Sequence, residues 1–238
     1  VWVDDITLHQ PWSNTGTAHR ITAVVDIADL LSLSGDYREI DSDFHGLGSR
    51  SGQGYTHITY NAGATMYLNR FTPPLWSLYA PVNYSWSLGI SKPVFQSGSD
   101  YRLDDTESWN ERSQNRNWST GFQLRKNSNA ESVLGRYLID PFRFVHTYSR
   151  GYGLTPSTRD TSSTAEGSIS YDISPGRMQL FSLPVIEYLR IRPSRVSWSL
   201  ARRNNWETRW SFLNDDTVQT RATILSTLSS TGSITFTP

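Results

Sequence analysis

The side chains that could carry out catalysis are scattered along the chain. Cysteine is absent, which excludes disulfides, thiolate zinc sites and a thiol nucleophile. The sequence has no zinc-protease helix motif, no nucleophile elbow, no phosphate-binding loop and no dinucleotide fingerprint. Neighbouring strand residues face opposite ways, so the adjacent pairs Asp4-Asp5 and Asp215-Asp216 do not form a carboxylate dyad. We therefore expect no enzymatic activity and no cofactor.

Two clusters of acidic residues could in principle bind a hard cation such as calcium. Asp41, Asp43 and His45 lie in one polar stretch, and three acidic residues lie within 104–107. Calcium needs clustered oxygen ligands, but neither stretch has the spacing of an EF-hand loop. We interpret both as solvated acidic loops and expect no metal site.

Composition narrows the class of protein further. Lys plus Arg number 22 and Asp plus Glu number 22, so the formal net charge is zero. A neutral chain lacks the basic field that attracts nucleic acid, and we expect no nucleic-acid partner. Aromatic residues make up 13% of the chain, and no apolar run is long enough for a transmembrane helix. This composition favours an all-β fold made of amphipathic strands.

The main pattern in the sequence is an alternation with period two. Tyr84, Trp86 and Leu88 alternate with Ser85 and Ser87, so one face of a strand there is apolar and the other is small and polar. The same pattern recurs in other segments, which we predict to be strands: 21–30, 31–37, 58–68, 117–124, 142–148, 167–173, 196–200, 206–212, 221–228 and 233–236.

Strand length and connections point to a membrane. Several of the alternating segments reach about ten residues, which a membrane-crossing strand needs and most soluble strands do not reach. Residues 214–216 and 229–232 are typical of tight turns, whereas 39–54, 92–115 and 150–163 are typical of long polar loops. Short turns at one end and long loops at the other characterise bacterial barrels. We predict an antiparallel up-and-down membrane β-barrel.

This prediction assigns a side to particular residues. Those expected to face lipid, in part as an aromatic girdle, are Tyr84, Trp86, Leu88, Phe122, Trp198 and Trp210. Those expected to face the lumen are Ser85, Ser87, Gly121 and Gln123. Further aromatic residues that could join the girdle are Trp76, Tyr79, Trp109, Trp118 and Trp206; the alternative is the interior of a soluble β-sandwich. Arginines that could line the lumen, or simply be solvated, are Arg112, Arg116, Arg202, Arg203 and Arg209.

Four segments in order resemble the SprA/Sov family of outer-membrane translocons of the type 9 secretion system, which are linked to gliding motility. Residues 1–8 (VWVDDITL) are similar to a segment that closes a small sandwich-like module, and 17–30 to the strand that follows. Residues 80–87 (APVNYSWS), followed by Lys92-Pro93, resemble a repeated strand motif of the family. Residues 139–144 (IDPFRF), followed by Tyr148-Ser149, resemble another, with Pro141 where the family tends to have Asn.

The resemblance implies that the chain is a segment of a very large barrel in the bacterial outer membrane. Residues 1–8 would be the last strand of an upstream β-sandwich-like module, and 9–238 a barrel segment of about ten or eleven strands. Its function would be the export of cargo proteins, with a smaller barrel partner and a periplasmic plug. Two alternatives remain: a small outer-membrane porin or adhesin barrel, and a secreted β-sandwich that binds carbohydrate.

Overall fold

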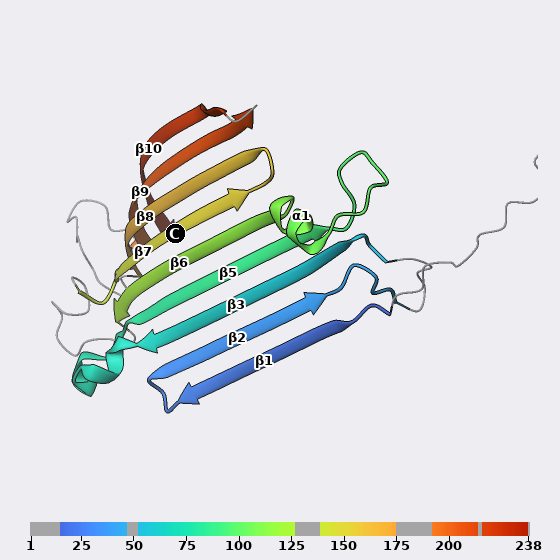
Figure 1. Ribbon diagram of the computed structural model, residues 1–238. Coiled ribbons are helices and arrows are strands. Elements are labelled where there is room, and N and C mark those ends of the chain that lie inside the picture. Colours follow the sequence, from blue (N-terminus) through green and yellow to red (C-terminus); the bar gives the residue numbers. More distant parts are fainter. Residues whose placement is uncertain (1–14, 47–51, 127–138, 175–191, 214–215, 238) are drawn as a thin grey trace, which may run out of the picture.

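A computed structural model of the chain describes residues 15–46, 52–126, 139–174, 192–213 and 216–237. They form one sheet of ten strands, shown in Figure 1 as a single curved layer. The strands are β1 (Ala18–Ile27), β2 (Leu31–Ile40), β3 (Tyr55–Tyr67), β4 (Leu78–Tyr79), β5 (Pro81–Pro93), β6 (Ser113–Lys126), β7 (Phe142–Leu154), β8 (Thr158–Ile173), β9 (Arg192–Leu213) and β10 (Asp216–Thr237). The helices are short: η1 (Leu68–Phe71), η2 (Pro74–Trp76) and α1 (Asp105–Asn110).

The strand order follows the chain. Each long strand pairs antiparallel with the next one in sequence, and only the two-residue β4 lies off this path, where it pairs with β6. The predicted all-β, antiparallel up-and-down topology is therefore confirmed. Within the described residues β1 and β10 are the two ends of the sheet and do not pair with each other, so the sheet is not closed into a barrel.

The described residues build no hydrophobic interior. Among the side chains that the structure describes, only Ser42, Ala80 and Pro81 are buried, and large apolar side chains such as Ile21 and Ile224 are mostly exposed. A soluble domain normally covers the apolar face of a sheet with a second layer. None of the described helices is both long and apolar enough to span a lipid bilayer.

Two predictions about connections are wrong. Residues 150–163 are not a long loop, because β7 and β8 continue through them and are joined by the short turn 155–157. Residues 229–232 are not a tight turn, because they lie inside β10 and pair with β9. The serines and threonines there are typical of turns in isolation, but β-branched threonine also fits a paired strand.

Short turns and long loops are also not segregated to opposite ends of the sheet. The β7–β8 turn lies at the same end as the long connection 94–112 that contains α1. The opposite end has the short turn 28–30 and the longer connection 68–80. Connection length in the described part of the chain therefore does not tell the two ends apart.

The acidic cluster at 104–107 has a structural role. The Asp104 carboxylate accepts a hydrogen bond from the Glu107 backbone N–H at 2.7 Å, and the Glu107 carboxylate accepts one from the Asp104 N–H at 3.0 Å. This reciprocal pair is a capping box that begins α1. The carboxylates thus stabilise a helix end in a long connection.

Replacing the capping residue should loosen α1 selectively. Asp104→Ala is expected to cost about 1 kcal/mol and to raise the amide exchange rate of Glu107 about fivefold, because its N–H loses its acceptor. Hydrogen exchange measured by NMR or mass spectrometry checks this. Asp105→Ala is the matched control, since the Asp105 side chain is not part of the capping box. An equal rise in both variants would contradict the capping role.

The upstream module expected at residues 1–8 lies outside the described residues. So do a helical turn that the sequence suggests at 130–138 and most of an irregular stretch that it suggests at 174–193.

Candidate functional site

The two faces of the sheet differ sharply in chemistry. Successive strand residues point to opposite sides, and the pairing register fixes which residues of neighbouring strands share a side. Trp86 pairs with Ala62 and Trp118, so these three side chains lie on one face, which we call the apolar face. Ser85 pairs with Gly63 and Ser119 on the other, which we call the polar face.

The register carries this division across the whole sheet. All six residues predicted to face lipid, Tyr84, Trp86, Leu88, Phe122, Trp198 and Trp210, lie on the apolar face. All four predicted to face the lumen, Ser85, Ser87, Gly121 and Gln123, lie on the polar face. The sequence thus separated the two sets correctly, while their assignment to lipid and lumen stays a prediction.

Aromatic rings on the apolar face contact one another across strands. Trp118 and Tyr148 have ring centroids 5.1 Å apart, and Phe122 and Phe144 have centroids 6.0 Å apart. Phe142 meets Tyr171 edge-on at 5.1 Å between β7 and β8, and Tyr37 lies 5.0 Å from Tyr60 between β2 and β3. Such cross-strand pairs stabilise a sheet without a second layer.

The aromatic residues are not distributed as a simple ring. Trp86 and Trp198 lie in the middle of the apolar stretches of β5 and β9. Trp118 and Trp206 lie on the same face in the paired row of Trp86, and Trp210 lies nearer to the end of the sheet that carries α1. The remaining three candidates are in connecting elements: Trp76 in η2, Tyr79 in β4 and Trp109 in α1.

The polar face is lined by small side chains that bond across strands. The hydroxyls of Ser85 and Ser119 are 2.8 Å apart, and those of Ser197 and Ser233 are 2.7 Å apart. Gly151 lies directly against Ser162, because a Cβ added at position 151 would be 2.7 Å from the Ser162 hydroxyl oxygen. Around Ser85, Ser119 and Gly151 the polar face therefore carries small side chains.

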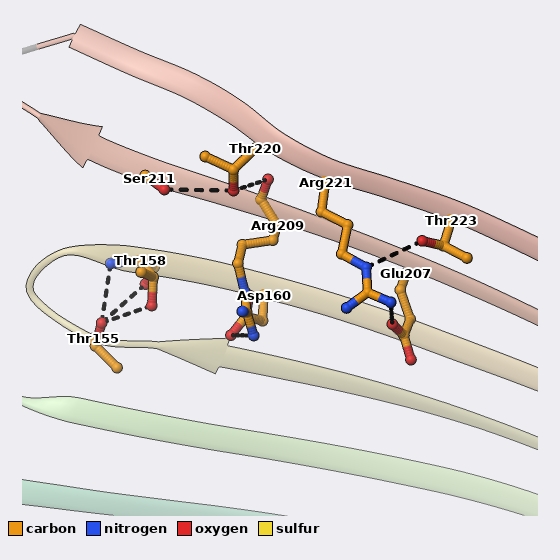
Figure 2. A network of polar contacts seen from close by, with 9 residues as sticks. All are labelled: Thr155, Thr158, Asp160, Glu207, Arg209, Ser211, Thr220, Arg221 and Thr223. Carbon is orange, nitrogen blue, oxygen red and sulfur yellow. Dashed lines mark hydrogen bonds and ion pairs between the residues drawn. The ribbon is translucent and has the colours of Figure 1, made fainter.

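Charged residues on the polar face form cross-strand pairs. Arg20 lies 2.9 Å from Asp36 between β1 and β2, and Arg209 lies 2.6 Å from Asp160 between β8 and β9. Arg195 pairs with Asp172 further along β8 and β9. Figure 2 shows the end of this network, where Arg221 of β10 approaches Glu207 of β9 at 3.9 Å.

A hollow of about 540 Å³ lies mainly on the polar face, near its α1 end. Five neighbouring strands, β3 and β5 to β8, contribute to it. Several lining residues have little or no side chain, including Gly89, Ser91, Gly151 and Gly153. Small residues cannot build tall walls, so the hollow reflects the curvature of the sheet, and the polar face is concave there.

The apolar stretch shifts position from strand to strand. The midpoint of the stretch, counted along the chain and without regard to the face of that residue, is Val24 in β1 and Trp198 in β9. The paired row that starts at Val24 runs through Ser34, Gly63, Ser85, Ser119, Ser149, Thr164 and Asn205. Asn205 is seven residues from Trp198 on β9, reached after seven strand pairings. The apolar stretches thus form a band, which we call the apolar belt, that is almost level from β1 to β5 and oblique from β5 to β9. The row through Trp86 reaches Ala23 in β1, next to Val24, but it reaches Trp206 in β9, eight residues from Trp198 after four pairings.

Two of the five arginines considered as lumen-lining or solvated residues lie on the apolar face. Arg116 and Arg202 lie on the apolar face, Arg203 and Arg209 lie on the polar face, and Arg112 follows α1. Arg150, which the sequence did not single out, also lies on the apolar face opposite Trp118. The signal was present in the alternation, because Arg116 has the same parity as Trp118 and Phe122.

The other acidic cluster, at 41–45, is held together by local hydrogen bonds. The Ser42 hydroxyl donates to the Asp41 carboxylate at 3.0 Å, and His45 Nδ1 lies 3.1 Å from the Asp43 carbonyl oxygen. Among the residues that the structure covers, no three His, Asp or Glu side chains come together as a metal-binding group.

No protein-family profile matches the chain, and no curated protein matches it significantly.

Proposed function

We propose that this chain forms part of the wall of a bacterial outer-membrane β-barrel that exports proteins. The apolar face contacts lipid, and the polar face lines a wide aqueous lumen. The observation that carries the proposal is one uncovered apolar face running across a single-layer sheet, from Ile21 in β1 to Ile234 in β10. Water does not tolerate such an area, whereas the hydrocarbon of a membrane covers it.

The slant of the apolar belt supports a membrane crossing. Outer-membrane strands tilt by about 35–45° from the barrel axis, and neighbouring strands lie about 4.8 Å apart with a rise of about 3.3 Å per residue. A level lipid layer then crosses the paired rows by about 1.0–1.5 residues per strand. The observed drift from Val24 to Trp198 averages one residue per pairing, and almost all of it falls between β5 and β9.

The polar face suits a passage for large cargo. It is concave where the hollow lies, and many of the residues that line the hollow are glycines or carry small hydroxyl side chains. Its cross-strand ion pairs, such as Arg209–Asp160, compensate much of the charge, which leaves a weaker field for ion selection than a ring of one sign. These features favour an unselective conduit over a narrow ion-selective pore.

The open edges favour a large barrel over a small one. A complete small barrel needs its first and last strands to pair, and the described β1 and β10 do not. A secreted carbohydrate-binding sandwich needs a second sheet against the apolar face, and the described strands form one sheet. The resemblance of residues 80–87 and 139–144 to export translocons then selects protein export, with a smaller barrel and a periplasmic plug as partners.

Within this proposal the belt limits which residues lie in hydrocarbon. A band about 25 Å tall covers about ten residues of a strand tilted by 40°. Tyr84, Trp86, Leu88, Phe122 and Trp198 fall inside it. Trp210 is twelve residues from Trp198 on the same strand, so it lies beyond the belt, where β9 extends out of the membrane.

Single cysteines at neighbouring positions test the two faces. Because this chain has no cysteine, Trp86→Cys and Ser87→Cys each introduce one thiol. In the full-length protein in intact outer membranes, a water-soluble maleimide should label Ser87→Cys at least about tenfold faster, because hydrocarbon disfavours the reactive thiolate at position 86. Both variants should label completely after denaturation in detergent.

Equal labelling of the two thiols in the membrane would contradict the wall proposal. A second arm tests export itself. A bulky polyethylene-glycol maleimide on Ser87→Cys should reduce release of cargo proteins into the medium, whereas the small maleimide should not. Unchanged release with a fully modified Ser87→Cys would favour the porin or adhesin alternative.

A further inference from the structure

Three arginines on the apolar face lie on a line along one edge of the apolar belt. Arg116 is five residues from Gly121, the middle of the apolar stretch of β6. Arg150 is five residues from Val145 in β7, and Arg202 is four from Trp198 in β9. With a rise of about 3.3 Å per residue and a tilt of about 40°, each Cα lies about 10–13 Å from the middle of the belt.

That depth is where the hydrocarbon of a membrane ends. The apolar band of an outer-membrane barrel is about 25 Å tall, so its edge lies about 12 Å from its middle. Arginine on the lipid side costs about 2–4 kcal/mol at the middle of the membrane but only about 0–1 kcal/mol at this level. The line of arginines therefore coincides with the layer of lipid head groups.

Arg116 and Arg150 share a crevice on the apolar face. Arg150 pairs with Trp118, two residues from Arg116 on the adjacent strand, which places the two arginines diagonally. The crevice has a volume of about 560 Å³, and its other lining residues are Tyr84, Trp86, Trp118, Gly151, Tyr152 and Thr161. Two cationic groups beside four aromatic rings suit a ligand with a phosphate at one end and a hydrocarbon chain at the other.

Nothing in the described sheet neutralises these cations. All three arginines are exposed, and none takes part in an ion pair among the residues that the structure describes. The described strands place one carboxylate on the apolar face, Glu39 in β2, which accepts a hydrogen bond from the Tyr37 hydroxyl. The polar face differs, since Arg20, Arg195 and Arg209 there have carboxylate partners.

We propose that the Arg116–Arg150 crevice binds the phosphate of an anionic membrane lipid, whose acyl chains lie along Trp86 and Trp118. Arg202 continues the same contact with a neighbouring lipid. This inference rests on the proposed membrane wall. It adds the class of lipid that binds and the depth at which the wall lies in the membrane.

Brominated lipids test the lipid site and the membrane wall separately. The full-length protein is reconstituted in phosphatidylcholine vesicles that contain increasing amounts of phosphatidylglycerol, with bromine on the acyl chains of one lipid or the other. Bromine quenches the fluorescence of nearby tryptophans, so quenching by each lipid reports its association with the belt. For the wild type we expect phosphatidylglycerol to associate with the belt about 25-fold more strongly than phosphatidylcholine, because each of the two arginines contributes a factor of about five.

The double variant Arg116→Gln/Arg150→Gln should lose most of this preference. Arg203→Gln/Arg209→Gln removes the same charge from the polar face and should keep the wild-type preference. An equal preference in the wild type and in Arg116→Gln/Arg150→Gln would overturn the lipid site. Loss of the preference in millimolar inorganic phosphate would also overturn it, since the crevice would then bind any free phosphate. Absence of quenching by both brominated lipids would instead refute the membrane wall.

Discussion

Ala62→Arg is expected to destabilise the protein in the membrane by about 2–4 kcal/mol, the cost of an arginine on the lipid side at the middle of a bilayer. Ala62 lies on the apolar face of β3, opposite Trp86 and midway along its apolar stretch. Alanine has little side chain to lose, so the effect reports the new charge. The fraction of folded full-length protein in vesicles, titrated with urea, measures the change.

The neighbouring position provides the control. Asn61→Arg adds the same side chain to the polar face, where Asn61 pairs with Ser87. If the polar face lines an aqueous lumen, as we propose, water solvates the guanidinium there, so a change below about 1 kcal/mol is expected. If both variants are destabilised equally, the two faces of β3 meet the same environment and the membrane assignment fails.

Lys126→Met is expected to cost about 2–3 kcal/mol, because it removes the cation from the most buried ion pair that the structure describes. Lys126 Nζ lies 2.7 Å from the Asp140 carboxylate, and the two side chains keep only 15% and 9% of their exposure. A buried carboxylate without its cation is costly, and the remaining exposure reduces the usual penalty. Urea unfolding of the folded protein measures the loss.

An exposed pair of similar length serves as the comparison. Arg70 lies 2.8 Å from Asp29, and both side chains are mostly exposed. Arg70→Met should therefore change stability by less than about 1 kcal/mol. Combining Lys126→Met with Asp140→Asn should restore part of the loss, because the charge is removed together with its partner. A full-size loss in the combined variant would show that packing of the lysine stem, and not the ion pair, is responsible.

The two faces could be predicted from the sequence because alternation is local. Whether Ser87 and Leu88 face opposite ways depends only on the pleat of β5, and a run of alternating residues shows it directly. Turn residues were less reliable. Ser229 and Ser230 suggested a turn, but their pairing with Ala201 and Leu200 in β9 overrides the local preference. Pairing between β7 and β8 likewise overrides the local preference for a loop at Arg150 and Ser163, which pair with each other.

Properties of the whole sheet could not be predicted from the sequence. The slant of the belt depends on the register between strands, which joins residues as distant as Val24 and Asn205. Closure depends on what pairs with the free edges of β1 and β10, which no local pattern shows. The side of Arg116 was predictable from its parity with Trp118, but a single arginine among polar neighbours such as Asn115 and Asn117 resembled a solvated strand end.

The strand order has an evolutionary consequence. Since every long strand that the structure describes pairs with the long strands before and after it, two consecutive strands form a unit that begins and ends at the same end of the sheet. A gene segment encoding such a unit can be duplicated or deleted without reversing the direction of any strand that follows. Tandem duplication is thus a direct route by which an ancestral sheet of this kind gains width, two strands at a time.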